Sequence, residues 1–547
     1  MLSCLEELRD KNLIELLGEN PSTERYGVST TASSRNIVGA IVPLPQPTME
    51  ADTQLISKIL SIANENNIKI YPISTGNNWG YGDAQPVSTK PSVILDLSKL
   101  KKIQTYSLDG LVTIQPGVTQ QDLHDYLRKE QSHYMVPVTG AGPNCSIVGN
   151  LLERGYGITP HADHFQATTS ITAILADGSI YQPPLHALDS TQEKLVDKVF
   201  KWGVGPYLEG IFTQGNAGVI TNATIKLAPK PEAFSSFYFF VNDDKDFEKA
   251  TEAVKAILHT YEGNVGSINL MDARRVLSMV AEKPEVTPGK SQVVSDEEIN
   301  QLRAQYQIAA WTGIGSIYGS KNVVSAVKKD LKKLFRQNNA INRHMFLTPQ
   351  LIKLAKLMLG ILPKFKLVAG LLDQVNAAEK GMEIMLGKPN EVALPLTYWR
   401  NSTPPPKQNM DPARDRCGLL WYAPLIPMQK EKMRNFVSLI REVCPKHGID
   451  PLITFTNFDP HGADSTIPLL FNQESQQDVE AAKACYDELF DSGCKQGFVP
   501  YRIGIDQQNK IVKETAYWKT VSTIKTALDP KGVIAAGRYD GREIDKN

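Results

Sequence analysis

The sequence predicts an α+β protein divided into at least two domains. The chain has 547 residues, more than one domain usually holds, and 41% of them are hydrophobic, which is ordinary for a globular protein. Helical and strand-like patterns alternate from about residue 40 to residue 230. Pro229 and Pro231 then break the chain before a second series of strands and helices, so we expect a boundary there.

The first section has clear periodicities. Apolar residues at helical spacing predict a helix over 51–66, and β-rich runs predict strands over 93–97, 112–117 and 219–227. A helix through Leu123 and Leu127 should follow the second of these strands. The runs 171–175 and 177–180 predict a hairpin, because the Asp177-Gly178 pair between them suits a type I′ turn.

The second section opens with a predicted strand over 237–241 and a helix over 247–261. Two polar segments with prolines, 285–300 and 401–416, are expected to be surface loops, the second lying over the site or at an interface. The last piece, 497–547, contains a predicted helix over 516–527.

Composition excludes several function classes. Lys plus Arg and Asp plus Glu both number 59, so the formal net charge of zero does not indicate nucleic acid or an anionic membrane as a partner. The six cysteines form no CxxC pair, and no uncharged apolar run reaches transmembrane length. The charged N-terminal residues are not typical of a signal peptide, so a cytoplasmic protein is expected. His161 and His164 lack a third ligand at helical spacing, so no metal site is expected.

A glycine-rich loop is the most informative segment. It runs from Gly76 to Gly82 between two predicted strands, and its small residues allow backbone amides to face an anion. It lacks the Lys and hydroxyl pair of a P-loop and the strand–GxGxxG–helix context of a Rossmann fingerprint. The loop therefore predicts a dinucleotide pyrophosphate held by amides alone, outside the usual nucleotide folds.

An ordered series of motifs extends this loop. The segments are 76–81, 115–118, 149–157, 159–164, 200–214, 216–221, 501–502 and 529–537. Together they resemble the vanillyl-alcohol oxidase and p-cresol methylhydroxylase family of FAD-dependent enzymes. The resemblance implies an FAD-binding domain from residues 1–230, an antiparallel-sheet cap over 231–495, and a C-terminal segment, 496–547, that completes the FAD site.

The resemblance also implies which residues contact FAD. Those residues are Gly76, Asn77, Asn78, Gly80, Tyr81, Pro143, Cys145, Ser146, Gly149, Asn150, Gly155, Gly157, Ile158, Gly218, Val219, Ile220 and Arg538.

Four residues are the expected catalytic group. By resemblance, Tyr81, Tyr501 and Arg502 hold a para-substituted phenol as its phenolate, since Arg is permanently charged and two phenols can donate to one oxygen. Hydride can then leave the benzylic carbon for flavin N5. Asp163 matches a position beside the reacting carbon, where a carboxylate can accept a proton.

The sequence departs from the family pattern at the covalent flavin link. The aligned position falls near Ser465, where neither His nor Tyr stands. His461 and Cys145 are the alternative attachment points, and noncovalent FAD is the favoured interpretation.

Several functional alternatives stay open from the sequence. The same fold could act on a hydroxy acid or a biosynthetic intermediate, or the chain could be a flavin-binding subunit without catalysis, or bind no FAD. The favoured substrate is a small aromatic compound, with O₂ or an electron-transfer protein as acceptor, and the resemblance implies a homo-oligomer.

Overall fold

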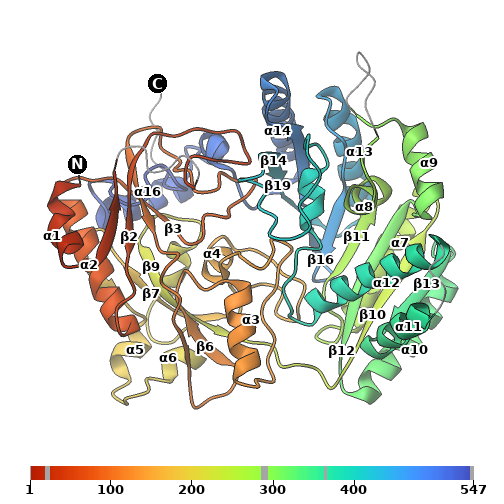
Figure 1. The fold of residues 1–547 in the computed structure, drawn as a ribbon, viewed down its shortest axis with the longest axis horizontal. Helices are drawn as coiled ribbons and strands as arrows, with labels where there is room; N and C mark the ends of the chain where they lie inside the picture. Colours follow the sequence, from red (N-terminus) through yellow and green to blue (C-terminus); the bar gives the residue numbers. More distant parts are fainter. Residues whose placement is uncertain (1, 19–24, 285–292, 362–365, 542–547) are drawn as a thin grey trace.

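The computed structural model describes residues 2–18, 25–284, 293–361 and 366–541. It has an N-terminal part and a cap, which lie side by side in Figure 1, with the C-terminal helix α16 (Ala516–Leu528) placed among the N-terminal elements. Among the described residues, no helix combines the length and hydropathy needed to cross a bilayer.

Two sheets build the N-terminal part. A four-stranded sheet has the order β1-β2-β4-β3, and a five-stranded antiparallel sheet has the order β5-β6-β9-β7-β8. The strands are β1 (Ile14–Leu17), β2 (Ile37–Pro43), β3 (Ile70–Ile73), β4 (Ser92–Asp96), β5 (Ile103–Thr105), β6 (Leu111–Ile114), β7 (Thr168–Ile174), β8 (Ile180–Tyr181) and β9 (Val219–Lys226). The helices are α1 (Glu6–Asp10), α2 (Met49–Glu65), α3 (Gln120–Lys129), α4 (Ile147–Leu152), α5 (Pro184–Leu188) and α6 (Val196–Val199).

The helix α2 shows why this part folds as it does. Thr48 caps its first turn by accepting a hydrogen bond from the Ala51 amide, 3.1 Å away. Its apolar face, which includes Ile56 and Ile59, is buried in the same core cluster as the four-stranded sheet. The helix connects β2 to β3, and both of these strands lie parallel to β4.

The cap contains the elements from β10 to β19. Its strands are β10 (Ala233–Val241), β11 (Ile268–Asp272), β12 (Trp311–Gly319), β13 (Arg343–Leu347), β14 (Cys417–Tyr422), β15 (Pro424–Pro427), β16 (Thr454–Asn457), β17 (Gly462–Asp464), β18 (Ile467–Asn472) and β19 (Val499–Pro500). Its helices are α7 (Phe247–Thr260), α8 (Ala273–Val280), α9 (Asp296–Tyr306), α10 (Lys321–Gln337), α11 (Pro349–Ile361), α12 (Lys366–Met385), α13 (Lys430–Lys446) and α14 (Gln476–Gln496), and α15 (Gln508–Ile511) follows the cap.

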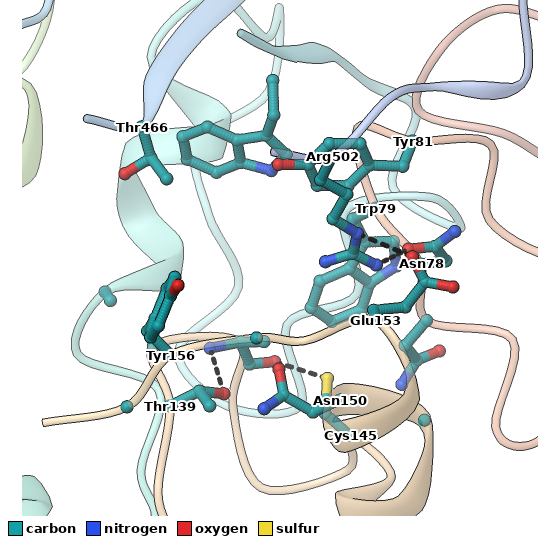
Figure 2. Close-up of a pocket in the computed structure, with 18 of the residues that line it drawn as sticks. Asn78, Trp79, Tyr81, Thr139, Cys145, Asn150, Glu153, Tyr156, Thr466 and Arg502 are labelled. Atoms are coloured by element: carbon teal, nitrogen blue, oxygen red, sulfur yellow. Dashed lines mark hydrogen bonds and ion pairs between the residues drawn. The ribbon is translucent and has the colours of Figure 1, made fainter. Parts of the chain in front are cut away.

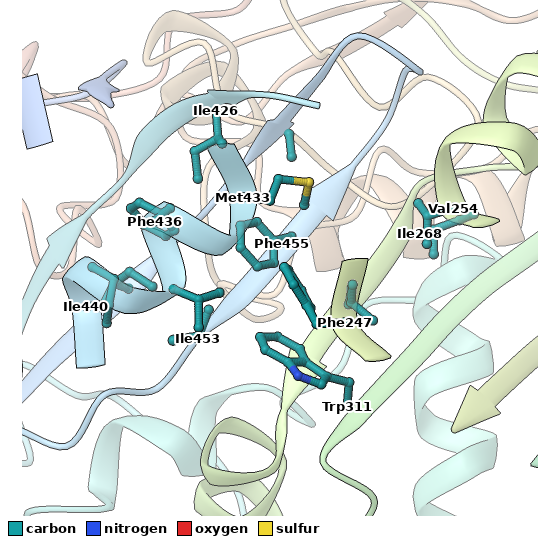
Figure 3. Close-up of a cluster of buried hydrophobic side chains, with 14 of the residues drawn as sticks. Phe247, Val254, Ile268, Trp311, Ile426, Met433, Phe436, Ile440, Ile453 and Phe455 are labelled. Atoms are coloured by element: carbon teal, nitrogen blue, oxygen red, sulfur yellow. The ribbon is translucent and has the colours of Figure 1, made fainter. Parts of the chain in front are cut away.

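An eight-stranded antiparallel sheet, β13-β10-β12-β11-β16-β17-β15-β19, forms the body of the cap. One face is a packed aromatic core: the Phe247 ring lies 4.3 Å from the Trp311 ring and 5.7 Å from the Phe455 ring, and Figure 3 shows these rings with Met433 and Phe436. Because side chains alternate along each strand, the opposite face is free to line a cavity.

The C-terminal segment returns to the N-terminal part. Ile534 forms a parallel bridge with Ile70 in β3, and the Ile70 amide donates to the Val533 carbonyl at 2.7 Å. The sheet of the cap continues through β19, beyond the boundary expected at residue 495, because Pro424 in β15 pairs with Pro500.

Most predicted elements are confirmed, with two differences. The hairpin of β7 and β8 forms, but its turn is not type I′: only Gly178 has a positive φ (88°), and its amide donates to the Leu175 carbonyl. Of the segment expected to be a loop over 285–300, residues 285–292 lie outside the described residues. Of the remaining residues, those from Asp296 onward belong to α9, whose first turn is stabilised by a capping box between Ser295 and Glu298.

Candidate active site

A cavity of about 880 Å³ lies between the N-terminal part and the cap. This volume is near the upper end of the range for ligand sites, about 300–1,000 Å³. Figure 2 shows Arg502, Tyr81 and Asn78 close together on one side of it, with Tyr156 and Thr466 across the open space. We call the side formed by residues 71–220 and 501–538 the N-terminal wall, and the side formed by cap residues 238–466 the cap wall.

Most of the predicted cofactor contacts line this cavity. They are Gly76, Asn77, Asn78, Tyr81, Cys145, Ser146, Gly149, Asn150, Gly155, Gly157, Ile158, Gly218, Ile220 and Arg538. Gly80, Pro143 and Val219 do not line it. The structure therefore gathers residues from four separate sequence segments around one space.

The glycine-rich loop lines the cavity and has three backbone amides without an acceptor in the described structure. Gly76 holds a left-handed φ of 76° that only glycine adopts easily. In the described part of the chain, the amides of Gly76, Asn77 and Asn78 donate to no protein acceptor. The Gly80 amide differs from the prediction, because it donates to the Thr30 hydroxyl at 2.7 Å and is not available to a ligand. This arrangement suits a phosphate group, which accepts from successive backbone donors.

Two glycines in the cavity lining, Gly155 and Gly157, are packed closely against their neighbours. A Cβ at Gly155 would lie 2.2 Å from the Asn150 side-chain oxygen, and one at Gly157 would lie 2.4 Å from His164. Neither position therefore accepts a side chain without displacing its neighbours. Ser146 caps α4 by accepting from the Gly149 amide at 2.9 Å, so this segment is held by its own hydrogen bonds.

Two arginines share one carboxylate in the N-terminal wall. The Nε of Arg502 lies 3.0 Å from Glu153, and Arg538 donates to the other Glu153 oxygen and, at 3.1 Å, to the Tyr71 hydroxyl. Burial alone would raise the pKa of Glu153, but the guanidiniums of Arg538 and Arg502 outweigh it and hold that pKa below its usual range. Two cations around one anion leave one positive charge in excess beside the cavity.

Arg502 still has a donor to offer. Its Nη2 donates to the Asn78 side-chain oxygen and its Nε to Glu153, while in the described residues Nη1 has no hydrogen-bond partner. The guanidinium lies 4.1 Å above the Tyr81 ring, a cation–π contact that fixes both side chains. Arg502 therefore combines fixed geometry with a free N–H group and a net positive environment.

Tyr81 and Tyr501 stand with Arg502 in the cavity lining. Burial raises the pKa of both hydroxyls, so both stay protonated and can donate at neutral pH. In the part of the chain that the structure describes, neither hydroxyl has a protein partner. The Tyr501 ring also lies 5.6 Å from the ring of Tyr156, which packs on Phe458 at 4.4 Å.

The cap wall presents a row of side chains set by strand register. Tyr238 pairs with Ile314, Ile314 with Asn269, Asn269 with Thr456, and Thr456 with Asp464, so these five residues run across the sheet on one face. All five line the cavity. The polar end of the row is Asp464, whose Oδ1 is buried without a hydrogen-bond partner among the described residues. Burial raises the pKa of its carboxyl to about 7.

Arg275 places a cation on the cap wall. It lies in α8, after the N-cap Asp272, and lines the cavity with its guanidinium 5.9 Å from the Trp421 ring. Its Nε and Nη1 atoms are buried, and among the described residues they have no hydrogen-bond partner. Trp421 in turn stands against the glycine-rich loop, because its backbone amide donates to the Gly80 carbonyl at 3.2 Å.

Asp163 lies away from the cavity, contrary to the prediction. Its side chain is exposed and accepts a hydrogen bond from the Gln166 amide at 2.8 Å, so it caps a surface turn. The neighbouring His164 is buried, and burial lowers its pKa to about 4, so its ring is neutral. This position does not support the catalytic role predicted for Asp163.

The candidate covalent links are placed very differently. The His461 side chain is 89% exposed and does not line the cavity, which removes it as an attachment point in this structure. Ser465 is buried, and its hydroxyl donates to the Thr454 carbonyl at 2.6 Å. Cys145 lines the cavity, but its thiol donates to the Ala141 carbonyl, and burial raises its pKa to about 12. A thiol with that pKa is a poor nucleophile at neutral pH.

Sequence reasoning missed four residues that the structure brings to the site. Glu153 and Tyr156 lie inside the motif 149–157, so their position in it was the available signal. Asp464 lies one residue before the aligned link position at Ser465, which gave a weaker signal. Nothing in the local sequence distinguished Arg275 from Arg274, because only the packing of α8 decides which of them faces the cavity.

Comparisons with known proteins agree with this geometry. A family model described as an FAD binding domain matches residues 49–182. The chain is 31% identical over 519 residues to the 1'-carboxy-chondrochloren decarboxylase of Chondromyces crocatus, covering 94% of this chain and 92% of that protein. It is 26% identical over 505 residues to the flavoprotein subunit of hydroxylating 4-cresol dehydrogenase from Pseudomonas putida, covering 90% and 87%.

A solved structure shows the same fold. The crystal structure of p-cresol methylhydroxylase with substrate bound matches with a TM-score of 0.83 and 24% identity, covering 100% of this chain and 97% of that chain. The fold class, the antiparallel cap and the FAD cofactor expected from the sequence are thereby confirmed. The chain belongs to the vanillyl-alcohol oxidase and p-cresol methylhydroxylase family of FAD-dependent oxidoreductases.

Proposed function

We propose that this enzyme removes a hydride from a benzylic-type carbon of a small para-substituted phenol. The observation that carries the proposal is the cluster of three unoccupied donors, the Tyr81 hydroxyl, the Tyr501 hydroxyl and Arg502 Nη1, on one side of the cavity. Three donors beside a surplus positive charge suit one oxyanion. Bound FAD supplies the two-electron acceptor for the hydride.

The chain's own residues favour the ionised phenol. A free phenol has a pKa of about 10, so it is mostly protonated at neutral pH. The surplus charge of the Arg502, Glu153 and Arg538 cluster lowers the cost of the phenolate, and the two tyrosines stay protonated and donate to it. Negative charge on the phenol oxygen pushes electrons into the ring and weakens the benzylic C–H bond toward hydride loss.

FAD would be held without a covalent bond. The amides of Gly76, Asn77 and Asn78 would bind its pyrophosphate. Gly155 and Gly157 in the lining would leave room for its ring system. The buried Cys145 thiol stays protonated and His461 lies outside, so neither supports a covalent link. Arg538 would place its charge near the cofactor, since it lines the same wall.

Asp464 replaces Asp163 as the carboxylate that serves the reacting centre. It lies on the cap wall and influences the charge state of Tyr501 electrostatically. A carboxyl whose pKa is about 7 can accept or return a proton near neutral pH. Its role would be to accept the proton that the substrate releases during its oxidation, and to return it afterwards.

A titration tests this proposal. The purified protein should be yellow, and acid precipitation should leave the yellow colour in the supernatant. Under anaerobic conditions, 4-ethylphenol should bleach the flavin band. Tyr501→Phe should slow this bleaching without releasing FAD, because it removes one phenolate donor. Absence of any spectral change with para-alkylphenols would defeat the proposal, and the same fold acting on a hydroxy acid, or a non-catalytic flavin subunit, would then be favoured.

A second candidate function is oxidation coupled to loss of CO₂. It is favoured by the relative named as a decarboxylase, which aligns over 94% of this chain. In a substrate with a carboxylate on the carbon next to the benzylic one, hydride loss leaves an electron-poor ring system. The C–COO⁻ bond then breaks, and its electron pair forms the new C=C bond. The products are an alkenylphenol, CO₂ and the reduced cofactor, and trapping of labelled CO₂ distinguishes this outcome from simple oxidation.

The electron acceptor and the assembly belong to the same proposal. We infer reoxidation by O₂ or by an electron-transfer protein, a homo-oligomeric enzyme and a cytoplasmic location. Oxygen uptake during turnover decides the first choice, and light scattering on the purified holoenzyme measures the second.

A further inference from the structure

The unpaired guanidinium of Arg275 is the feature of the cavity that the proposed reaction leaves unused. Arginines nearby are paired: Arg274 bonds Asp296 at 2.7 Å, and Arg400 bonds Asp450 at 2.9 Å. Arg275 has no ion pair within the described ranges, and its Nε and Nη1 are both buried and without a partner there. A buried cation without a counter-charge is costly, so a ligand that supplies the charge is expected at this point.

The nearest acidic group does not fill this role. Asp272 precedes Arg275 in the chain, but one oxygen of its carboxylate accepts from two backbone amides, that of Arg275 at 2.8 Å and that of Ile453 at 3.2 Å. Burial raises the pKa of Asp272 to about 6, so its carboxylate is mostly ionised at neutral pH, but among the described residues it forms no ion pair or hydrogen bond with the Arg275 guanidinium. Burial lowers the pKa of Arg275 to about 10, which still leaves its guanidinium protonated at neutral pH.

The surroundings of Arg275 indicate the kind of ligand. Val276 and Met279 follow Arg275 in α8 and line the cavity with apolar side chains, as Ile308 also does, and the Trp421 ring lies 5.9 Å from the guanidinium. An anion that reaches Arg275 must therefore be attached to an apolar chain or ring. A planar carboxylate matches the forked geometry of an arginine better than it matches a lysine.

We propose that Arg275 binds a carboxylate on the side chain of the substrate, so that the enzyme prefers phenols that carry a carboxylate to simple alkylphenols. This inference rests on the proposed function and names its substrate class. The two arginines then bind opposite ends of the substrate: Arg502 on the N-terminal wall binds the phenol oxygen, and Arg275 on the cap wall binds the carboxylate.

Calorimetric titration of the holoenzyme with a matched pair of probes tests this. The charged probe is 3-(4-hydroxyphenyl)propanoate and the neutral one is 4-propylphenol. The unaltered enzyme should bind the charged probe at least about tenfold more tightly. Arg275→Met should abolish this preference while changing the affinity for 4-propylphenol by less than about threefold. Arg275→Lys should retain part of it, because the charge remains but the fork is lost.

Arg274→Met is the matched control. Arg274 lies on the same helix but does not line the cavity, so its loss should leave the ratio of the two affinities unchanged. Bound FAD is measured in every variant. If Arg275→Met loses FAD instead of the preference, Arg275 serves the cofactor and the inference is overturned.

A third probe separates this inference from the proposed reaction. The compound 3-phenylpropanoate has the acid but no phenol. Binding that depends on Arg275 supports the carboxylate subsite even if no phenol reduces the flavin. If phenols bleach the flavin but neither acid binds better than 4-propylphenol, the phenol reaction stands and the Arg275 subsite is wrong.

Discussion

The two walls of the cavity differ in how their charged side chains are paired. The N-terminal wall carries charges that are already paired, as in the Arg502, Glu153 and Arg538 cluster, and backbone amides fixed by a glycine-rich loop. The cap wall instead carries isolated side chains: Asp464 and Arg275 both have buried polar atoms without a partner in the described structure.

This difference separates the tasks of the walls. The paired charges hold the N-terminal wall in place before any ligand arrives, so its free amides, hydroxyls and Arg502 Nη1 are already positioned to bind the cofactor and the phenol oxygen. Isolated buried charges are unfavourable until a ligand meets them, so they select the ligand that carries the complementary groups. Substrate choice should therefore respond to changes in the cap wall, and chemistry to changes in the N-terminal wall.

Loss of Arg502 should have the largest effect. Arg502→Met removes the charge that stabilises the phenolate, so kcat/KM for 4-ethylphenol should fall by about 10²–10³-fold. The control is Arg154→Met, because Arg154 bonds Thr213 at 3.0 Å and lies outside the cavity lining. Steady-state kinetics measure both variants. Unchanged kinetics in Arg502→Met would show that the phenolate is not held here.

A substitution where the two walls touch should have the next largest effect. Gly80 has a φ of 75°, and a Cβ there would lie 2.3 Å from Trp421 Cδ1. Gly80→Ala should therefore destabilise the protein by about 1–3 kcal/mol, measured by chemical unfolding. In the control Gly360→Ala a Cβ meets nothing within 4 Å in a helix, so stability should stay the same or rise slightly. Equal stability of the two variants would mean that the loop and Trp421 are not in contact.

Asp464→Asn should change the pH dependence of stability. Burial raises the pKa of Asp464 from 3.8 to about 7, so between these values the folded state holds a proton that the unfolded state has lost. Its contribution to stability therefore falls as pH rises from about 4 to 7 and then stays constant. The variant should be more stable than the unaltered protein at pH 8 by about 1–3 kcal/mol, and equal to it near pH 4. A difference independent of pH in urea unfolding would contradict the raised pKa.

Cys145→Ala should have the smallest effect. The buried thiol stays protonated, so we expect turnover within about twofold of the unaltered enzyme and the same release of FAD by acid. If the unaltered protein keeps its flavin in the acid pellet and Cys145→Ala releases it, the thiol is a covalent link after all.

The sequence predicted the N-terminal wall better than the cap wall, for a physical reason. Gly76 and Gly157 are needed by local backbone geometry and close approach, so they leave a pattern in a short stretch of sequence. Asp464 faces the cavity only because β16 and β17 pair in one register, which a local pattern does not reveal. Asp163 was predicted wrongly for a different reason: its motif was recognised, but its side chain accepts a local turn hydrogen bond from the Gln166 amide and is exposed.

The folded-back C-terminal segment sets the order in which the cavity can be assembled. Arg502 and Arg538 both pair with Glu153, which lies hundreds of residues earlier in the chain. Ile534 can join β3 only after almost all of the chain has been synthesised. During translation the glycine-rich loop is therefore synthesised long before Arg502 and Arg538, which complete the cavity. Productive flavin loading should consequently be a late, post-translational event, and pulse-labelled chains stalled before residue 534 should not retain the yellow chromophore.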